Sequence, residues 1–362
     1  MRHRLVRPSL AASFAAAVAV ATPHSAAALT AAEVLNYTGA DRNAVLYEGA
    51  KKEGQVVFYS GMIPNQTLRP LAESFQKKYP GVKLNYWRAD SEEIVVKMTA
   101  EQRAGNMVGD LLEGTGVGEL AVSAGLVQPF LTPALAEYPE QYRDPRHLWA
   151  PTRLSYFGTA YNTKQVSPDK VPRNLDALLD PQWQGKMAWS FGPATGAGLF
   201  ISSIRITLGE EKANAYFAKL AKQKIANLAE TARTVVDRVY AGEYAIGLAI
   251  YAHHPLISKG KGAPVDTVLM DPVTSAAGVM LVAKGLPHPN AAMLLVDFIL
   301  SKDGQEIMAK SEYFPARPDV AALPQLAPIV PTNAGFKEMF VNPETLQKYA
   351  DSSAKILGDV FR

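Results

Sequence analysis

The sequence predicts an α/β protein made of two domains, and three observations support this fold class. Strand-like and helix-like segments alternate three times between residues 55 and 124, as in a parallel sheet with crossover helices. Without an N-terminal leader roughly 330 residues remain, which exceeds the usual size of one core. Two extended segments, 151–161 and 265–270, have the pattern of strands that cross between domains.

The first 28 residues have the features of a secretory signal peptide. A basic head with three arginines precedes an alanine-rich apolar stretch, and Ala26 to Ala28 offer small residues for cleavage. The apolar stretch, 10–21, is shorter than the roughly 20 residues of a membrane span. We expect residues 1–28 to be cleaved on export; the alternative is an uncleaved N-terminal anchor.

Composition favours a globular protein with substantial cores. Hydrophobic residues make up 48% of the chain and charged residues only 20%, which argues against disorder. The chain has no cysteine, so disulfides, thiolate zinc sites and cysteine nucleophiles are excluded. The formal net charge of +3 includes the basic leader, and no long run of basic residues follows it. Nucleic acid is therefore not an expected partner.

The first predicted domain begins with a helical lead-in, 29–53, that Gly54 ends. Asn65 is expected to cap the first crossover helix, which stops near Pro80 and Gly81. The rest of this domain follows the same alternation. Its expected strands are 55–59, 82–87 and 110–113, and its further helices are 92–105 and 119–124.

The second predicted domain follows the crossing segment 151–161. A short helix at 175–179 and a strand at 187–190 lead to a glycine-rich turn that opens a helix at 199–208. Segment 265–270 is predicted as the return crossing. Two crossings imply that each domain is built from separated pieces of chain, and such domains hinge. Further expected elements are helices 212–222 and 291–300 and a strand at 278–283.

The stretch 231–254 carries the strongest local signal for a site. Thr234 and Asp237 have capping-box spacing at the start of a helix, and Gly242 suits its C-terminal cap. The apolar run 245–250 is typical of a strand covered on both faces. Polar side chains follow it directly: Tyr251, His253 and His254. Ligands of open α/β sheets bind past the carboxyl ends of strands, so we expect a binding site here; the alternative is an ordinary surface loop.

None of the common catalytic motifs occurs in the sequence. It lacks G-x-S-x-G, H-E-x-x-H and G-x-x-x-x-G-K-[ST], and Gly114 to Gly118 has the wrong spacing for G-x-G-x-x-G. On an extended segment, His253 and His254 are expected to point to opposite faces and not to chelate a metal together. We expect a binding protein without a cofactor; an exported metal-dependent enzyme is the alternative of another class.

Seven ordered motifs carry a resemblance to one family. They are GQVVFYSG from Gly54, FQKKYPGVKLNY from Phe75, GDLLEG from Gly109, YFGTAYNT from Tyr156, WSFGPATG from Trp189, GEYAIGLAI from Gly242 and LVAKGLPHPNAAMLLVDFILSKDGQEIMA from Leu281. Together they are similar to the periplasmic solute-binding proteins of ABC importers, specifically the ferric-iron-binding type.

The resemblance implies a type II periplasmic binding protein fold, with two α/β lobes, a two-strand hinge and a ligand enclosed between the lobes. It implies an N-terminal lobe at 29–155 and 272–325 and a C-terminal lobe at 156–271 and 326–362. It also implies a monomer in the periplasm that delivers a small-molecule ligand to an ABC permease and its ATPase.

At the iron-binding positions, the sequence departs from the family pattern. The iron-binding members have a Tyr-Tyr pair after the strand that corresponds to 245–250, and Ala252 and His253 stand there in this chain. Fe(III) prefers phenolate and carboxylate oxygens, so replacing these tyrosines removes affinity. Ferric iron stays the alternative ligand, held by Glu113, Tyr251 and His253.

We predict a small organic or phosphorylated anion as the ligand. Hydrogen-bond donors occur at several expected strand ends and helix N-termini, where free N–H groups favour negative charge. Arg233 is expected to give a bidentate contact to carboxylate or phosphate. Each residue taken alone also has an ordinary explanation as a packing glycine, a cap or a solvated charge. The predicted ligand contacts are Ser60, Gly61, Thr115, Gly116, Ser190, Thr195, Gly196, Arg233, Tyr251 and His253.

Overall fold

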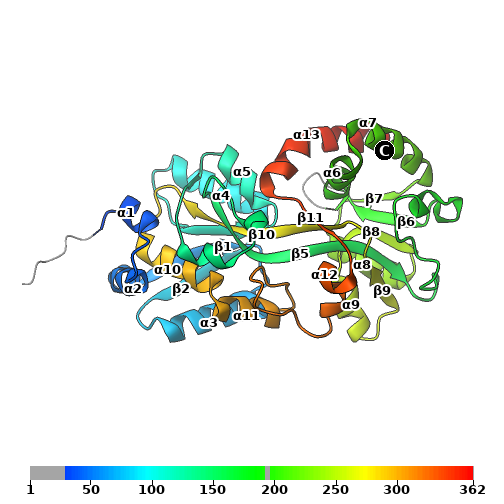
Figure 1. Ribbon diagram of the computed structural model, residues 1–362. Coiled ribbons are helices and arrows are strands. Elements are labelled where there is room, and N and C mark those ends of the chain that lie inside the picture. Colours follow the sequence, from blue (N-terminus) through cyan, green and yellow to red (C-terminus); the bar gives the residue numbers. More distant parts are fainter. Residues whose placement is uncertain (1–28, 192–195, 362) are drawn as a thin grey trace, which may run out of the picture.

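The computed structural model describes residues 29–191 and 196–361 and consists of two α/β lobes (Figure 1). Two long strands, β5 (Trp149–Asn162) and β10 (Val273–Ala283), run through the centre and connect the lobes. This arrangement confirms the predicted fold class. Within the described residues, no helix is both long and apolar enough to span a bilayer.

The first lobe has the alternation of strands and helices that the sequence predicts. β1 (Gln55–Ser60) pairs in parallel with β2 (Lys83–Arg88) and with β3 (Leu111–Gly114), so the carboxyl ends of all three lie at one edge. Gly54 ends the helix before β1 in the left-handed conformation, at φ 75°. Its other elements are α1 (Ala31–Asn36), α2 (Arg42–Glu53), α3 (Arg69–Lys78), α4 (Ser91–Arg103), α5 (Val117–Ser123), β4 (Val127–Gln128), α10 (Pro289–Leu300) and α11 (Lys302–Lys310).

The second lobe has a parallel sheet and a hydrophobic core of its own. β6 (Met187–Ser190) pairs in parallel with β7 (Ala226–Leu228) and with β8 (Ile246–Tyr251). Trp189 and Phe217 are among the large side chains of this core, which is separate from the core of the first lobe. Its helices are α6 (Ala197–Leu208), α7 (Glu210–Leu220), α8 (Ala232–Ala241) and α9 (His253–Gly260).

β5 passes from one lobe to the other. Its first half pairs antiparallel with β10, from Trp149 opposite Leu281 to Tyr156 opposite Ser275. Its second half pairs with β8 and with β9 (Val265–Val268) in the second lobe. The strand order of the whole sheet is therefore β2-β1-β3-β10-β5-β8-β6-β7. All of β5 is buried, so its polar side chains need partners inside the protein.

The predicted return crossing at 265–270 is wrong. β9 lies at this position and pairs with β5 inside the second lobe. The chain returns through β10, which begins at Val273 after the turn at Asp271 and Pro272. An edge strand and a crossing strand have the same alternating pattern, so periodicity does not distinguish them.

Two predicted helix caps are also wrong. Thr231, not Thr234, caps α8, and its hydroxyl accepts a hydrogen bond from the Thr234 N–H at 3.3 Å. Asn65 lies inside a π-helical turn, Pro64–Leu68, that precedes α3. Several polar side chains near a helix start can serve as its N-cap. The residue with an extended backbone conformation takes this role.

The C-terminal segment contacts both lobes. Pro343, at the start of α13 (Pro343–Val360), lies over Gly118 of α5. Further along α13, Ser353 is hydrogen-bonded to Ser202 of α6 at 3.1 Å. The predicted lobe boundaries stay predictions. Two short elements precede this helix: α12 (Pro331–Ala334) and β11 (Glu338–Phe340), which pairs with β10.

Candidate ligand-binding cleft

A cleft of about 420 Å³ opens between the lobes, at the carboxyl ends of the parallel strands. Residues at or just after the ends of β1, β2 and β3 form its first wall, and residues at or after the ends of β6, β7 and β8 form the opposite, second wall. The hinge strand β5 contributes Arg153 and Ser155. Ligands of open α/β sheets bind at the carboxyl ends of strands, so this cleft is the candidate site.

Six of the predicted contacts line this cleft, three on each wall. They are Gly61, Thr115, Gly116, Ser190, Tyr251 and His253. Ser60 and Arg233 lie outside the lining, as does Gly196, which forms an isolated bridge with Phe191 and precedes α6. Thr195 lies outside the described residues.

Ser60 and Glu113 are fully buried behind the first wall. The Ser60 hydroxyl donates to Glu113 Oε2 at 2.6 Å and accepts the Met62 N–H at 3.0 Å. Thr152 Oγ1 lies within hydrogen-bond distance of Glu113 Oε1, at 3.1 Å. Ser60 therefore affects the site through Glu113 and not as a contact of its own.

Arg153 is a cleft residue that sequence analysis missed. Its guanidinium is buried, forms an ion pair with Glu113 and lies over the Tyr313 ring, 4.7 Å from the centroid. Gly278 leaves room for it, because a Cβ there would lie 2.5 Å from Arg153 Nη1. Among the described residues, its side-chain hydrogen bonds use only Nη1, so other N–H donors remain for a ligand. The signal in the sequence was a lone arginine inside the apolar segment 151–161.

The rim of the first wall carries both signs of charge. Arg88 Nη2 lies 3.4 Å from Asp90 Oδ1, and both side chains are well exposed. Glu92 also lines the cleft and belongs to the first turn of α4. Because these groups face water, their field is screened more strongly than that of the buried Arg153.

Arg233 does not make the predicted contact with the cleft. Its guanidinium donates to Ser258 Oγ at 2.8 Å and to the His254 carbonyl at 3.3 Å, and it forms an ion pair with Asp237 at 3.0 Å. These bonds hold Arg233, and with it α8, against α9. Its charge nevertheless lies close to the two histidines.

His253 and His254 begin a helix, so the prediction that they lie on an extended segment is wrong. They are the first two residues of α9, and their ring centroids lie 4.6 Å apart. Pro255 follows them in α9, where proline is tolerated because it lies in the first turn of the helix. The Nδ1 atoms of both rings are buried and have no hydrogen-bond partner among the described residues.

Both histidines are held in the neutral form. Burial lowers the pKa of His253 well below its usual value, and the charges of His254, Arg153 and Arg233 lower it further. Burial and Arg233 lower the pKa of His254 to about 4. A neutral imidazole has one donor and one acceptor nitrogen, so each ring offers both kinds of contact.

Tyr251 ends β8 and faces the same part of the cleft. Its ring packs on Phe157 at 4.8 Å and on His254 at 5.1 Å between centroids. Burial raises the pKa of Tyr251, although Arg153 opposes this shift. The phenol is therefore protonated at neutral pH and is a hydrogen-bond donor.

The N-terminus of α9 is free to receive an anion. No side chain caps this helix, which begins after Ala252. In contrast, the Thr231 side chain caps α8 where that helix reaches the cleft. Free N–H groups and the helix dipole favour negative charge at such a position.

One of the iron ligands considered for this chain, Glu113, is already engaged in an ion pair. Among the described residues, no group of three or more histidine, aspartate or glutamate side chains is arranged to hold a metal ion. Glu113 is paired with Arg153, whereas Tyr251 and His253 lie on the second wall. In this conformation the donor set is therefore incomplete for Fe(III).

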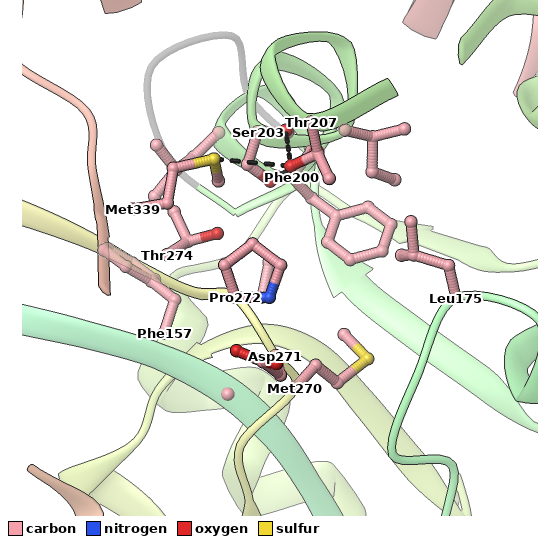
Figure 2. Close-up of a pocket in the computed structure, with 14 residues that line it drawn as sticks. Phe157, Leu175, Phe200, Ser203, Thr207, Met270, Asp271, Pro272, Thr274 and Met339 are labelled. Carbon is pink, nitrogen blue, oxygen red and sulfur yellow. Dashed lines mark hydrogen bonds between the residues drawn. The ribbon is translucent and has the colours of Figure 1, made fainter. Parts of the chain in front are cut away.

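A second, smaller cavity of about 70 Å³ lies between α6 and the hinge (Figure 2). Figure 2 shows Phe200, Pro272, Met270 and Met339 around it. Phe157 lines this cavity and separates it from Tyr251 in the cleft. Its size and apolar lining do not suit a charged solute.

Several known proteins are similar to this chain in sequence or in structure. The Fe(3+)-binding periplasmic protein of Serratia marcescens is 25% identical over 295 residues, which cover 78% of this chain and 85% of that protein. The Trichodesmium protein IdiA (FutA), solved with iron and citrate, aligns with a TM-score of 0.73 at 20% identity, over 85% of this chain and 99% of that one. AfuA of Actinobacillus pleuropneumoniae, solved with fructose-6-phosphate, aligns at 0.70 and 22% identity, over 85% and 99%.

The structural matches confirm the predicted type II periplasmic binding protein fold. The sequence profile of the bacterial extracellular solute-binding proteins matches residues 109–339, which is more than half of the chain. This protein therefore belongs to the bacterial extracellular solute-binding protein family.

Proposed function

We propose that this chain is the substrate-binding component of an ABC importer and captures a small organic or phosphorylated anion in the cleft. Its membership of the solute-binding family supports the transport role. The signal peptide predicted at 1–28 supports a location in the periplasm. In this role the protein delivers its ligand to a membrane permease driven by an ATPase.

The buried guanidinium of Arg153, which lines the cleft and has N–H donors left over, is the observation that supports an anion. Burial is the main cause that lowers the pKa of His253, and His254, Arg153 and Arg233 lower it further. The two arginine charges that oppose a proton there attract an anion. The uncapped N-terminus of α9 adds backbone donors at the same place.

Contacts on both walls explain how an anion closes the lobes. Thr115 and Gly61 offer donors on the first wall, Arg153 offers them from the hinge, and α9 offers them on the second wall. A ligand that touches both walls binds the closed form more tightly than the open form. This difference in affinity is what shifts the population toward closure.

Ferric iron is the second candidate ligand. The Serratia marcescens relative is named as an Fe(3+)-binding protein, and the Trichodesmium neighbour was solved with iron and citrate. Tyr251 and His253 are the donors that this chain offers on the second wall. The sugar phosphate in the neighbour AfuA favours the anion instead.

Calorimetry and thermal unfolding of the mature protein test the proposal. The probes are inorganic phosphate, fructose 6-phosphate, citrate and ferric nitrilotriacetate. We expect one anion to bind with 1:1 stoichiometry and to stabilise the protein by about 2.7 kcal/mol at a hundredfold excess over Kd. Binding of ferric nitrilotriacetate alone, with a visible phenolate-to-iron absorption band, contradicts the anion and supports the second candidate.

A further inference from the structure

The ion pair between Arg153 and Glu113 lies where the two hinge strands meet the first wall of the cleft. Arg153 belongs to β5, and Gly278 lies opposite it on β10. Glu113 is on β3, which pairs with β10 on its other side. The pair therefore links β3 of the first wall to the two hinge strands, β5 and β10.

We propose that this ion pair determines the specificity of the cleft: it makes the site accept an anion and reject a metal cation. The inference rests on the anion-binding function proposed above and names the residues that decide between the two candidate ligands. It assigns Glu113 to positioning Arg153 and not to metal binding.

Both carboxylate oxygens of Glu113 are engaged inside the protein. Oε2 accepts a hydrogen bond from Ser60 at 2.6 Å, and Oε1 is paired with Arg153. The carboxylate is fully buried, so it cannot turn to the cleft without losing these bonds in a region that excludes water. The adjacent guanidinium also repels a cation. A hard trivalent ion therefore finds no free carboxylate in the buried part of the first wall that the structure describes, because Asp90 and Glu92 lie at its exposed rim.

The surroundings of Arg153 favour an anion. Glu113 holds Nη1, and the Tyr313 ring supports the guanidinium plane from one side. The remaining N–H donors have no side-chain or backbone partner among the described residues. Glu113 thus fixes the orientation of the cation, but its negative charge also weakens the attraction between Arg153 and a ligand.

Two substitutions separate these effects. Glu113→Gln keeps an oxygen for the Ser60 hydroxyl but removes the negative charge, so we expect the best-binding anion probe to bind about tenfold more tightly. If the role of Glu113 were only structural, its substitution would not be expected to tighten anion binding. Arg153→Met removes the cation and frees Glu113, so we expect anion affinity to fall at least thirtyfold.

The same Arg153→Met variant is expected to gain metal binding. Titration with ferric nitrilotriacetate should produce a visible phenolate-to-iron band that wild type lacks. The band should be absent in Arg153→Met/Tyr251→Phe, because Tyr251 supplies the phenolate. It should also be absent in Arg153→Met/Glu113→Gln, because that variant lacks the Glu113 carboxylate.

Arg42→Met is the matched control. Arg42 forms another buried ion pair of the first lobe, with Asp297 at 2.7 Å, and neither residue lines the cleft. We expect this variant to lose stability but to keep the anion affinity of wild type and to give no iron band. The control separates loss of a buried ion pair from loss of this one.

Three results overturn the inference: an iron band in wild type, unchanged anion affinity in Arg153→Met, or weaker anion binding in Glu113→Gln. If Arg153→Met does not fold, Glu113→Gln still decides, because it retains the arginine. Failure of the proposed function has a different signature, since wild type then binds none of the anion probes. In that case, a phenolate-to-iron band that appears in Arg153→Met but not in wild type still shows that the ion pair excludes the metal.

Discussion

The two walls of the cleft differ in how many of their polar groups already have partners. On the first wall, Glu113 is bonded through both oxygens, and its partners Ser60 and Arg153 are fixed by it. On the second wall, the Nδ1 atoms of His253 and His254 are buried without a partner among the described residues, and α9 has no side-chain cap. The Glu113 carboxylate behind the first wall is therefore fully engaged, whereas the second wall has buried imidazole nitrogens left for a ligand.

This difference suggests a division of roles during binding. A buried polar group without a partner costs about 1–3 kcal/mol. A ligand that supplies the missing partners on the second wall recovers this free energy only when the lobes close around it. The ion pair of Glu113 sets the charge of the site, and the buried imidazoles of the second wall favour closure.

Disturbing the first wall should have the largest effect. In Gly278→Ala, the new Cβ would lie 2.5 Å from Arg153 Nη1 and 2.9 Å from Glu113 Oε1, so the guanidinium has to move. We expect anion affinity to fall by about 2–3 kcal/mol, the value of a charged hydrogen bond. Calorimetric titration measures the change.

Gly260→Ala is the control for this substitution. Gly260 ends α9, and nothing lies within 4 Å of a Cβ built there. We expect its affinity to match wild type. Equal affinities for both variants would mean that the position of Arg153 does not matter.

The second wall should make the stability of the ligand-free protein depend on pH. The folded pKa of His254 is about 4, below the unfolded value of about 6.5. Below pH 6.5 the unfolded chain therefore binds a proton that the folded protein does not, and stability falls as pH falls. His254 alone should lower the free energy of unfolding by about 2 kcal/mol between pH 7 and pH 5. His253 acts in the same direction.

Urea unfolding of wild type and His254→Phe at both pH values measures this slope. We expect the variant to lose less stability than wild type on acidification. Asp110 has the opposite effect on the pH dependence of stability, because burial raises its pKa to about 6. It is present in both proteins, so its contribution cancels in the difference. Equal slopes would show that His254 is already protonated or hydrogen-bonded in the folded protein.

The fold was predictable where the signals are local. The strand expected at 187–190 has those bounds, and the one expected at 110–113 lies at 111–114. Apolar runs bounded by glycine are set by the segment itself. The return crossing was not predictable in this way, because only pairing distinguishes β9 from β10.

The site was half predictable for a related reason. Strand ends placed Thr115 and Tyr251 at the cleft, since parallel strands share one functional edge. The choice between Arg153 and Arg233 depends on which side of its element each side chain faces once the lobes pack. The sequence favoured Arg233, which is near a helix start. The arginine that lines the cleft is Arg153, in the hinge strand.

Replacing His253 or His254 by phenylalanine should change stability and anion affinity in opposite directions. In His253→Phe or His254→Phe at pH 7, a ring of similar shape without polar atoms removes an unsatisfied nitrogen. We expect the ligand-free protein to gain about 1 kcal/mol of stability and to lose about 1 kcal/mol of anion affinity. Thermal unfolding and calorimetry measure the two changes.

His288→Phe is the matched control for these variants. Its Nδ1 lies 2.9 Å from Asp110 Oδ2, so the substitution removes the ring partner of a buried carboxylate and leaves it only the backbone N–H groups of residues 57 and 288. We expect it to destabilise the protein by about 3 kcal/mol without changing affinity. If His253→Phe destabilises the protein as much, then its imidazole has a partner and is as fully engaged as Glu113.

Arg233→Met should have the smallest effect, because its charge reaches the cleft only through α9. Its ion pair with Asp237 is about 40% exposed on both sides, at 41% and 39%, so little stability is lost. We expect anion affinity to fall by about twofold to threefold, from the weaker potential at His253. Arg238→Met, on the same helix and paired with Glu230, is the control and should bind like wild type. A loss beyond thirtyfold in Arg233→Met would instead make Arg233 a direct ligand contact in the closed form, which means that α8 and α9 rearrange when the lobes close.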